Sequence, residues 1–174
     1  LDLIIVDDGS TDGSGVICDN YAVNDERITV IHQKNKGLSA ARNAGLDRMS
    51  GDLVAFLDSD DAYEDVFIEK LLNAMRTADA DLAVCKYTVH HTTRKLKRYG
   101  SRGMPYGASG IYNHHQGLRA LADGTIITAV WNKLYRRELW QEIRYPDGHV
   151  CEDRYTTFRI FDLCDTIYVL NEPL

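Results

Sequence analysis

Short apolar runs alternate with amphipathic stretches through the first half of the chain. The apolar runs predict strands at residues 3–6, 28–31, 53–57 and 82–89. The run at 53–57 is unbroken, which is typical of a strand buried on both faces. Apolar residues at helical spacing predict helices over residues 14–23, 37–49 and 65–78. This alternation predicts an α/β fold with a mostly parallel central sheet flanked by helices.

Each predicted helix has one apolar face that we expect to turn inward. The inward residues are predicted to be Val16, Ile17 and Tyr21, then Leu38, Ala41 and Leu46, then Phe67, Ile68, Leu71, Leu72 and Met75. The second half is less regular. Its pattern predicts helices over 115–122 and 152–163, an apolar and basic stretch over 131–140, and a strand over 166–170. In the last helix, Phe158 and Phe161 are expected to face the core.

Composition limits the class of protein. A chain of 174 residues with 44% hydrophobic residues suits one globular domain. The formal net charge of −6 argues against a nucleic-acid-binding protein. The four cysteines form no CxxC pair, which favours buried free thiols in a reducing compartment. Because the chain opens at Leu1 within a strand pattern, we expect it to begin inside a longer protein.

Acidic residues follow two of the predicted strands. Asp58 and Asp60 come directly after the third strand, and their spacing would let both bind one Mg²⁺ or Mn²⁺ ion. Asp7 and Asp8 end the first strand, and the carboxyl ends of parallel strands share one edge of a sheet, where ligands bind. The alternative for each acidic group is a helix N-cap.

A glycine-containing helix start lies near the same edge, at residues 35–45. Lys36 and Arg42 add positive charge there, and a helix N-terminus favours anions, so a diphosphate is one predicted ligand. The alternative is that Arg42 only braces the acidic loops. The one basic segment, residues 94–110, is predicted to be either a mobile solvated loop or a surface near an anionic substrate.

Five segments together resemble the family 2 glycosyltransferases. They are Leu3-Ile4-Ile5-Val6-Asp7-Asp8-Gly9-Ser10-Thr11-Asp12, the N-x-G-x-x-x-A-R-N-x-G pattern of residues 35–45, the DXD motif Asp58-Ser59-Asp60, Asn132-Lys133-Leu134-Tyr135-Arg136-Arg137, and Glu152-Asp153. The resemblance implies a GT-A fold, a Rossmann-like nucleotide-diphospho-sugar transferase architecture that here lacks the family's first strand–helix unit. It also implies a UDP-sugar donor, Mn²⁺ or Mg²⁺ as cofactor, and inversion at the anomeric carbon.

The resemblance also implies roles for single residues. Asp8 would contact the uracil, and Asp58 would lie by the ribose and the metal. Asp60 would be the direct metal ligand and Asp153 the general base. Asp7, Lys36, Arg42 and Ser59 complete the predicted nucleotide-sugar site. Without the resemblance, acids at a helix start are the simpler interpretation of Glu152-Asp153.

The predicted protein is a single truncated catalytic domain over residues 1–174. Residues 1–90 would bind the nucleotide sugar and residues 91–174 would bind the acceptor and catalyse transfer. We expect a hexosyltransferase of bacterial surface glycan synthesis, with a glycan or lipid-linked glycan as acceptor and no nucleic acid as partner. It would work in the cytoplasm, either free or at the inner face of the membrane. The alternatives are a sugar-phosphate nucleotidyltransferase and a non-catalytic nucleotide-sugar-binding remnant.

The segment at 131–137 contains an aromatic residue and three basic residues whose roles have two interpretations each. Trp131 is predicted either to stack on a sugar or to belong to the core. Lys133, Arg136 and Arg137 are predicted either to bind diphosphate or an anionic acceptor, or to be exposed strand-edge charges. The chain has no Gln-x-x-Arg-Trp motif, which favours addition of a single sugar over processive synthesis.

Overall fold

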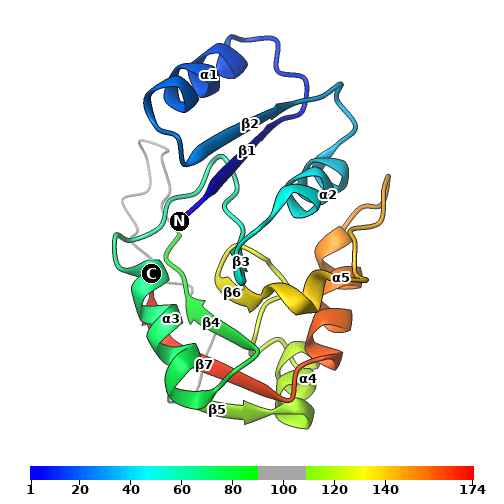
Figure 1. The fold of residues 1–174 in the computed structure, drawn as a ribbon. Helices are drawn as coiled ribbons and strands as arrows, with labels where there is room; N and C mark the ends of the chain where they lie inside the picture. The colour runs from blue at the N-terminus through cyan, green and yellow to red at the C-terminus, as the bar shows by residue number, and fades with distance from the viewer. Residues whose placement is uncertain (90–108) are drawn as a thin grey trace, which may run out of the picture.

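The computed structural model describes residues 1–89 and 109–174, which form two sheets (Figure 1). The smaller sheet pairs β1 (Leu3–Asp7) with β2 (Ile28–His32) in parallel, and α1 (Ser14–Asn24) connects them. The larger sheet has five strands in the order β3 (Leu53–Ala55), β6 (Lys133–Arg136), β4 (Leu82–Lys86), β7 (Thr166–Pro173) and β5 (Gly110–Asn113). The predicted α/β class is confirmed. The basic segment predicted at 94–110 lies almost wholly outside the described residues.

Strand directions in the larger sheet differ from the mostly parallel arrangement that we predicted. Among its described pairs, only β4 and β7 run parallel, whereas β3–β6, β4–β6 and β5–β7 are antiparallel. The parallel prediction came from the strand–helix alternation of the first half. β5 and β6 come from the second half, where no such alternation sets the direction. β6 lies between β3 and β4 and runs against both.

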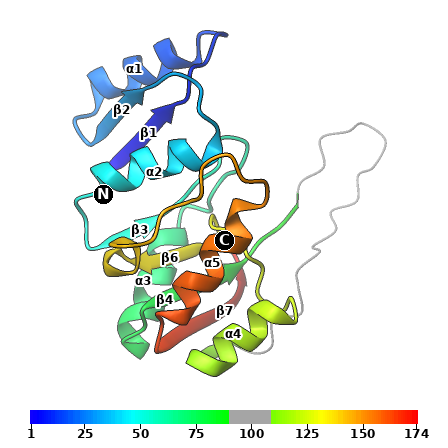
Figure 2. The same ribbon diagram turned by 90° about the vertical axis from the view of Figure 1, so that its right-hand side faces the viewer.

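The larger sheet is covered on both faces (Figure 2). Successive side chains of β4 point to opposite faces of the sheet. Leu82 and Val84 belong to the core cluster on one face, and Ala83 and Cys85 belong to the cluster on the other. On the Ala83 side lies α3 (Phe67–Ala78), which buries Phe67, Leu71, Ala74 and Met75. On the Leu82 side lie α4 (His114–Ala122) and α5 (Glu152–Asp162). β4 is therefore buried on both faces, and β6 likewise places Tyr135 in one cluster and Leu134 in the other.

The strand predicted at 53–57 is shorter and less buried than expected. β3 ends at Ala55, all three of its residues are half-buried, and Leu57 is 50% exposed. The reason is that β3 is an edge strand of the larger sheet, where its one described partner is β6. The segment after β6 folds as a short 3-10 helix, η1 (Arg137–Trp140), which buries Leu139 and Trp140.

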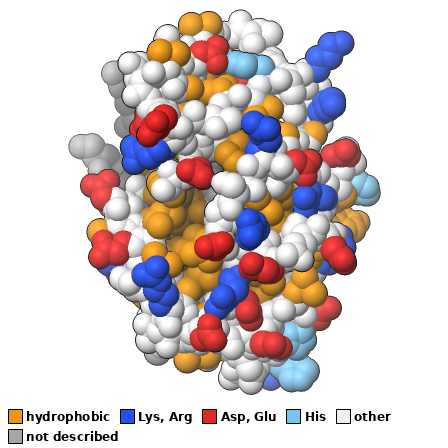
Figure 3. All heavy atoms as spheres, viewed as in Figure 1, with side chains coloured by type: hydrophobic (Ala, Val, Ile, Leu, Met, Phe, Trp, Pro, Cys, Tyr) orange, Lys and Arg blue, Asp and Glu red, His pale blue; other side chains and the backbone are white. Residues whose placement is uncertain are grey.

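One predicted helix face is wrong, and a second is wrong at one residue. In α1, Val16, Ile17 and Tyr21 are 65%, 58% and 63% exposed, because this helix packs mainly against the narrow two-stranded sheet. In α2 (Leu38–Arg48), Leu38 is 51% exposed and the buried residues are Ser39, Arg42 and Leu46. Phe158 of α5 is 37% exposed, whereas Phe161 is fully buried. Figure 3 shows hydrophobic side chains open to the surface across the middle of the viewed face.

Candidate active site

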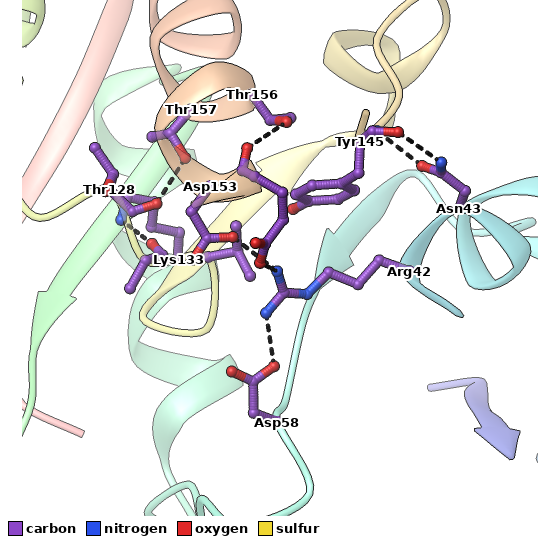
Figure 4. Close-up of polar contacts among 12 residues, drawn as sticks. Arg42, Asn43, Asp58, Thr128, Lys133, Tyr145, Asp153, Thr156 and Thr157 are labelled. Carbon is purple, nitrogen blue, oxygen red and sulfur yellow. Dashed lines mark hydrogen bonds and ion pairs between the residues drawn. The ribbon is translucent and has the colours of Figure 1, made fainter. Parts of the chain in front are cut away.

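One arginine joins three acidic side chains from distant parts of the chain (Figure 4). Arg42 of α2 donates from Nη2 to Asp58 Oδ1 at 2.9 Å. Its Nη1 donates to Glu152 Oε1 at 2.8 Å and to Asp153 Oδ1 at 2.7 Å. The Arg42 side chain is only 7% exposed, so these contacts replace water around a buried charge. The predicted metal-side residue Asp58 and the predicted base Asp153 therefore belong to one cluster.

The DXD segment lies in the turn that follows β3. The backbone N–H of Asp61 donates to the Asp58 carbonyl at 3.0 Å, which closes the turn and leaves Ser59 and Asp60 exposed at its tip. Burial, together with the negative charges of Asp60 and Asp58, raises the pKa of Asp61. Carboxylates are thus crowded on this turn, and a divalent cation would relieve their repulsion.

The donor set fits a cation shared with a ligand. Among the described residues, no group of three or more His, Cys, Asp or Glu side chains forms a complete metal site. Asp58 and Asp60 supply oxygen atoms from one turn, which suits a hard cation that completes its shell with water and phosphate. The predicted assignment of Mn²⁺ or Mg²⁺ to this pair stays a prediction.

Asp153 is the second residue of α5, and its environment raises the pKa of its carboxyl. Burial raises the pKa of this carboxyl to about 6, the nearby charge of Arg42 lowers it, and Glu152 beside it raises it. Glu152 and Asp153 occupy the first turn of α5, where acids favour the helix N-terminus. The Thr156 hydroxyl donates to the Glu152 carbonyl at 2.9 Å, one turn along the helix. A carboxylate with a pKa of about 6 suits proton transfer near neutral pH.

Asp8 is held rigidly at the end of β1. Gln33 Nε2 donates to it at 2.7 Å, and the backbone N–H groups of Lys36 and Gly37 donate at 3.0 and 2.8 Å. Burial raises the pKa of Asp8, but these three hydrogen bonds outweigh burial and lower it. Gly9 makes the turn possible, because a Cβ on it would lie 2.7 Å from the Asn35 nitrogen. Lys36 is exposed and contributes its backbone to the Asp8 carboxylate.

Asp7 turns toward α1 and β2. It accepts a hydrogen bond from the Ser10 N–H at 2.9 Å and pairs with His32 Nδ1 at 2.9 Å. His32 Nε2 in turn lies 2.8 Å from Asp19 of α1. Hydrogen bonds from Ser10 and His32 lower the pKa of Asp7 to about 2. The sequence placed Asp7 at the nucleotide site but gave no sign of this partner, His32.

Two residues that we did not single out, Asn43 and Tyr145, complete the Arg42 cluster. The Asn43 side chain donates to the Tyr145 carbonyl at 2.9 Å and accepts from the Tyr145 N–H at 2.8 Å. The Arg42 guanidinium lies 5.2 Å from the centre of the Tyr145 ring. The buried Tyr145 hydroxyl has no hydrogen-bond partner among the described residues. Asn43 lies within the segment at 35–45, but nothing in the sequence distinguished Tyr145.

The Lys133 side chain is hydrogen-bonded to the loop before β6. It is fully buried and donates to the carbonyl of Ile127 at 2.9 Å, to that of Ala129, and to Asn132 Oδ1 at 2.8 Å. Burial lowers its pKa to about 7. The predicted contact of Lys133 with diphosphate is therefore wrong, and so is its alternative as an exposed edge charge. Trp131, in the same loop, is half-buried and packs edge-on against Tyr87 at 4.9 Å between ring centres.

Arg136 and Arg137 lie at the opposite end of β6 from the acidic cluster. The register pairs Arg136 with Leu53, at the start of β3, and the Arg136 guanidinium donates to Asp79 at 2.6 Å. Arg137 donates to the Ser50 carbonyl at 2.8 Å. The antiparallel direction of β6 explains this placement, which excludes both arginines from the predicted contact with diphosphate.

Known proteins match the chain in sequence and in fold. The family described as Glycosyl transferase family 2 matches residues 1–144. Glycosyltransferase GlyA of Streptococcus pneumoniae is 34% identical over 179 residues, which cover the whole chain and 26% of that relative. S. aureus TarS 1–349 in complex with UDP-GlcNAc has a TM-score of 0.77 at 22% identity, over 98% of this chain and 47% of that chain.

A more distant structure has the same fold. The mannosyltransferase PcManGT from Pyrobaculum calidifontis, in complex with GDP-Man and Mn²⁺, has a TM-score of 0.64 at 15% identity over 99% of this chain and 46% of that one. The predicted GT-A fold is confirmed. The chain spans only part of the length of each of these proteins. By the extent of the family match, this chain belongs to glycosyltransferase family 2.

Proposed function

We propose that the chain is the catalytic part of an inverting glycosyltransferase that moves a sugar from a UDP-sugar to an acceptor hydroxyl in bacterial surface glycan synthesis. The observation that carries the proposal is the Arg42 cluster, which brings Asp58 of the DXD turn and Asp153 of α5 to the same guanidinium. Residues 1–90 would supply most of the donor site, and residues 91–174 the base and the acceptor side. The acceptor is a glycan or lipid-linked glycan, met in the cytoplasm or at the inner face of the membrane.

On the donor side, Asp8 would accept a hydrogen bond from the uracil. Its carboxylate accepts three hydrogen bonds already, and an ionised carboxylate has about four acceptor positions, so capacity remains for one more. Lys36 is exposed near this site and can approach a diphosphate, and Ser59 lies at the tip of the DXD turn. Asp7 contributes by fixing the β1 turn beside Asp8. The UDP-GlcNAc bound to TarS supports a uridine donor.

Asp58 and Asp60 would hold Mn²⁺ or Mg²⁺, whose chemistry there is to stabilise negative charge on the leaving diphosphate. The Mn²⁺ in the PcManGT complex supports this cofactor. Asp153 would take the proton of the acceptor hydroxyl as the hydroxyl oxygen attacks the anomeric carbon. One base and one displacement invert that carbon, and the bond to the diphosphate oxygen breaks as the new glycosidic bond forms.

The test uses the full-length protein and a panel of UDP-sugars, and measures UDP release and product formation with and without Mn²⁺. We expect sugar transfer that depends on the cation, and weaker cation dependence of UDP binding in Asp60→Ala. Equal metal dependence in the variant would overturn the assignment of Asp60. Pyrophosphate release from UTP and a sugar 1-phosphate would instead identify a nucleotidyltransferase. UDP binding without any transfer would identify a non-catalytic remnant.

None of the helices in the described part of the chain has the length and apolar character needed to span a membrane. The proposed position at the inner face of the membrane is a separate part of the proposal. Sedimentation of the full-length protein with vesicles that contain anionic lipids would test that part of the proposal, with vesicles of neutral lipids as the control.

A further inference from the structure

Arg42 is the only residue of α2 that contacts both the DXD turn and the start of α5 among the hydrogen bonds of the described residues. It lies at the centre of the buried face of α2, between Ser39 and Leu46. The sequence predicted that Arg42 either lies beside the nucleotide diphosphate or only braces the acidic loops. Its guanidinium is enclosed by three carboxylates and by the Tyr145 ring, which leaves it poorly placed for a direct contact with the donor.

The neighbouring residue holds the same segment through the backbone. Asn43 exchanges two hydrogen bonds with the main chain of Tyr145, eight residues before Asp153. Arg42 and Asn43 are adjacent in α2, so one rigid helix fixes both the path into α5 and the carboxylates at its start. Displacements near 1 Å at a reacting group cost up to about 10²-fold in rate, so such a brace affects catalysis directly.

We infer that Arg42 is a positioning residue, which holds the base Asp153 and the donor-side Asp58 at a fixed separation by binding both through one planar guanidinium. Asn43 assists by fixing the backbone before α5. The inference rests on the proposed function, because it assigns Asp153 the role of base. It differs from a donor-binding role for Arg42, which would affect donor affinity rather than turnover.

The geometry of the guanidinium explains why arginine is required. Its two terminal nitrogens are directed differently, one to Asp58 and the other to the pair Glu152 and Asp153. An ammonium carries its charge at one point and cannot keep the same separation between two carboxylates. Lysine at this position would preserve the charge but would leave the distance between Asp153 and Asp58 less well fixed.

The charged environment of Asp153 gives a second readout. The groups that face it or share its electrostatic field come from α2, the turn after β3, β6, the segment before α5 and α5 itself. They are Arg42, Asp58, Lys133, Tyr135, Tyr145 and Glu152. Burial, Glu152 and Asp58 raise the pKa of Asp153, and Arg42 lowers it. Loss of the Arg42 charge therefore raises this pKa further, so the base becomes available only at higher pH. Loss of the Glu152 charge has the opposite effect.

The experiment measures kcat, donor KM and the pH dependence of kcat/KM in full-length enzyme. Arg42→Lys should lower kcat by about 10-fold to 10²-fold, as expected for a misplaced base, while donor KM changes by less than about threefold. Arg42→Met should also shift the acid limb of the kcat/KM profile to higher pH. Glu152→Gln should shift that limb to lower pH. Arg48→Met is the matched control, because Arg48 is exposed on the same helix.

Three outcomes separate the possibilities. If Arg42→Lys keeps the wild-type kcat, or raises donor KM more than it lowers kcat, the inference is overturned. If Arg42→Met does not fold, Arg42→Lys and Glu152→Gln still test the inference. An acid limb that stays at the wild-type pH in Glu152→Gln would overturn it, because Asp153 would then not titrate within this cluster. If wild-type enzyme transfers no sugar from any donor, the proposed function fails. Active wild type with unaffected Arg42 variants overturns only the positioning role.

Discussion

The layer formed by β1, α1 and β2 and the five-stranded sheet are held together by different interactions. No residue of β1, α1 or β2 is buried, whereas Leu82, Ala83, Val84 and Cys85 of β4 are all 0% exposed. The first layer depends on backbone pairing and on polar contacts such as those of Asp7 and Asp8. Segments with few buried apolar contacts open most easily. Of the predicted donor residues, Asp7 and Asp8 thus lie on the softer layer, whereas Asp58 and Ser59 follow β3 of the larger sheet and the predicted base lies in α5, which packs on that sheet.

A cavity in the firm layer should have the largest effect on stability. Leu71→Ala removes a fully buried side chain of α3 and should lower the free energy of unfolding by about 2–5 kcal/mol. Urea unfolding measures the change. A loss below about 1 kcal/mol would show that α3 contributes little to the core.

Loss of the base should have the largest effect on turnover. Asp153→Asn keeps the shape of the side chain but cannot accept a proton, so transfer should fall by about 10²-fold or more while UDP-sugar affinity is retained. Steady-state kinetics and calorimetry of the full-length enzyme give the two quantities. If Glu152→Gln is inactive and Asp153→Asn is nearly normal, the base is Glu152. If both stay active, the start of α5 supplies no base.

On the softer layer, Asp8→Ala should weaken UDP binding by about 10-fold, the range of a hydrogen bond to a charged group. Binding of Mn²⁺ without nucleotide should change less, because the cation is assigned to Asp58 and Asp60. Unchanged UDP affinity in this variant would mean that Asp8 only organises the loop between Gln33 and Gly37.

The pH dependence of turnover should reflect Asp153. Because burial raises the pKa of this carboxyl to about 6, its basic form is lost as the pH falls through that value. The acid limb of kcat/KM in the wild-type enzyme should therefore have its midpoint near pH 6, and Asp153→Asn should lack that limb in its residual activity. A midpoint near the ordinary aspartate value would show that this carboxyl is better solvated during catalysis than the structure indicates.

The smallest effect is expected at the surface of α1. Val16→Ala should change the free energy of unfolding by at most about 0.5 kcal/mol, since the Val16 side chain is 65% exposed. Chemical denaturation beside Leu71→Ala tests the contrast between layers directly. A loss of 2 kcal/mol or more would mean that α1 is covered in the full-length protein.

Much of the fold could be predicted because the first half of the chain alternates strands and helices with clear apolar periodicity. The boundaries of α1, α2, α3 and β4 agree with the predicted ranges to within a few residues. Burial was predicted less well, since an apolar stripe shows that a helix is amphipathic but not which sheet covers it. The direction of β6 depends on long-range pairing with β3 and β4, which no local pattern records.

The candidate site shows the same limit. The acids at 7–8, 58–60 and 152–153 could be found from strand ends and the family resemblance. Their convergence on Arg42 involves contacts between residues up to 111 positions apart in sequence. Tyr145 has no signal in the sequence, because its role depends on its backbone and on the face of its ring. Lys133 was misplaced because its charge suggested an exposed side chain, whereas three oxygen acceptors hold it inside.

The burial of Lys133 makes this residue an internal reporter for chemical labelling. Lys34 and Lys36 are exposed on the softer layer, so an amine-acylating reagent should modify both in the native protein. Lys133 is 0% exposed and cannot react until the loop around it opens. Burial is what lowers the pKa of this amine, so opening of the loop would restore an ordinary lysine that reacts at the rate of an exposed one. Mass spectrometry of the labelled chain would thus record opening of the loop before β6, without any engineered probe.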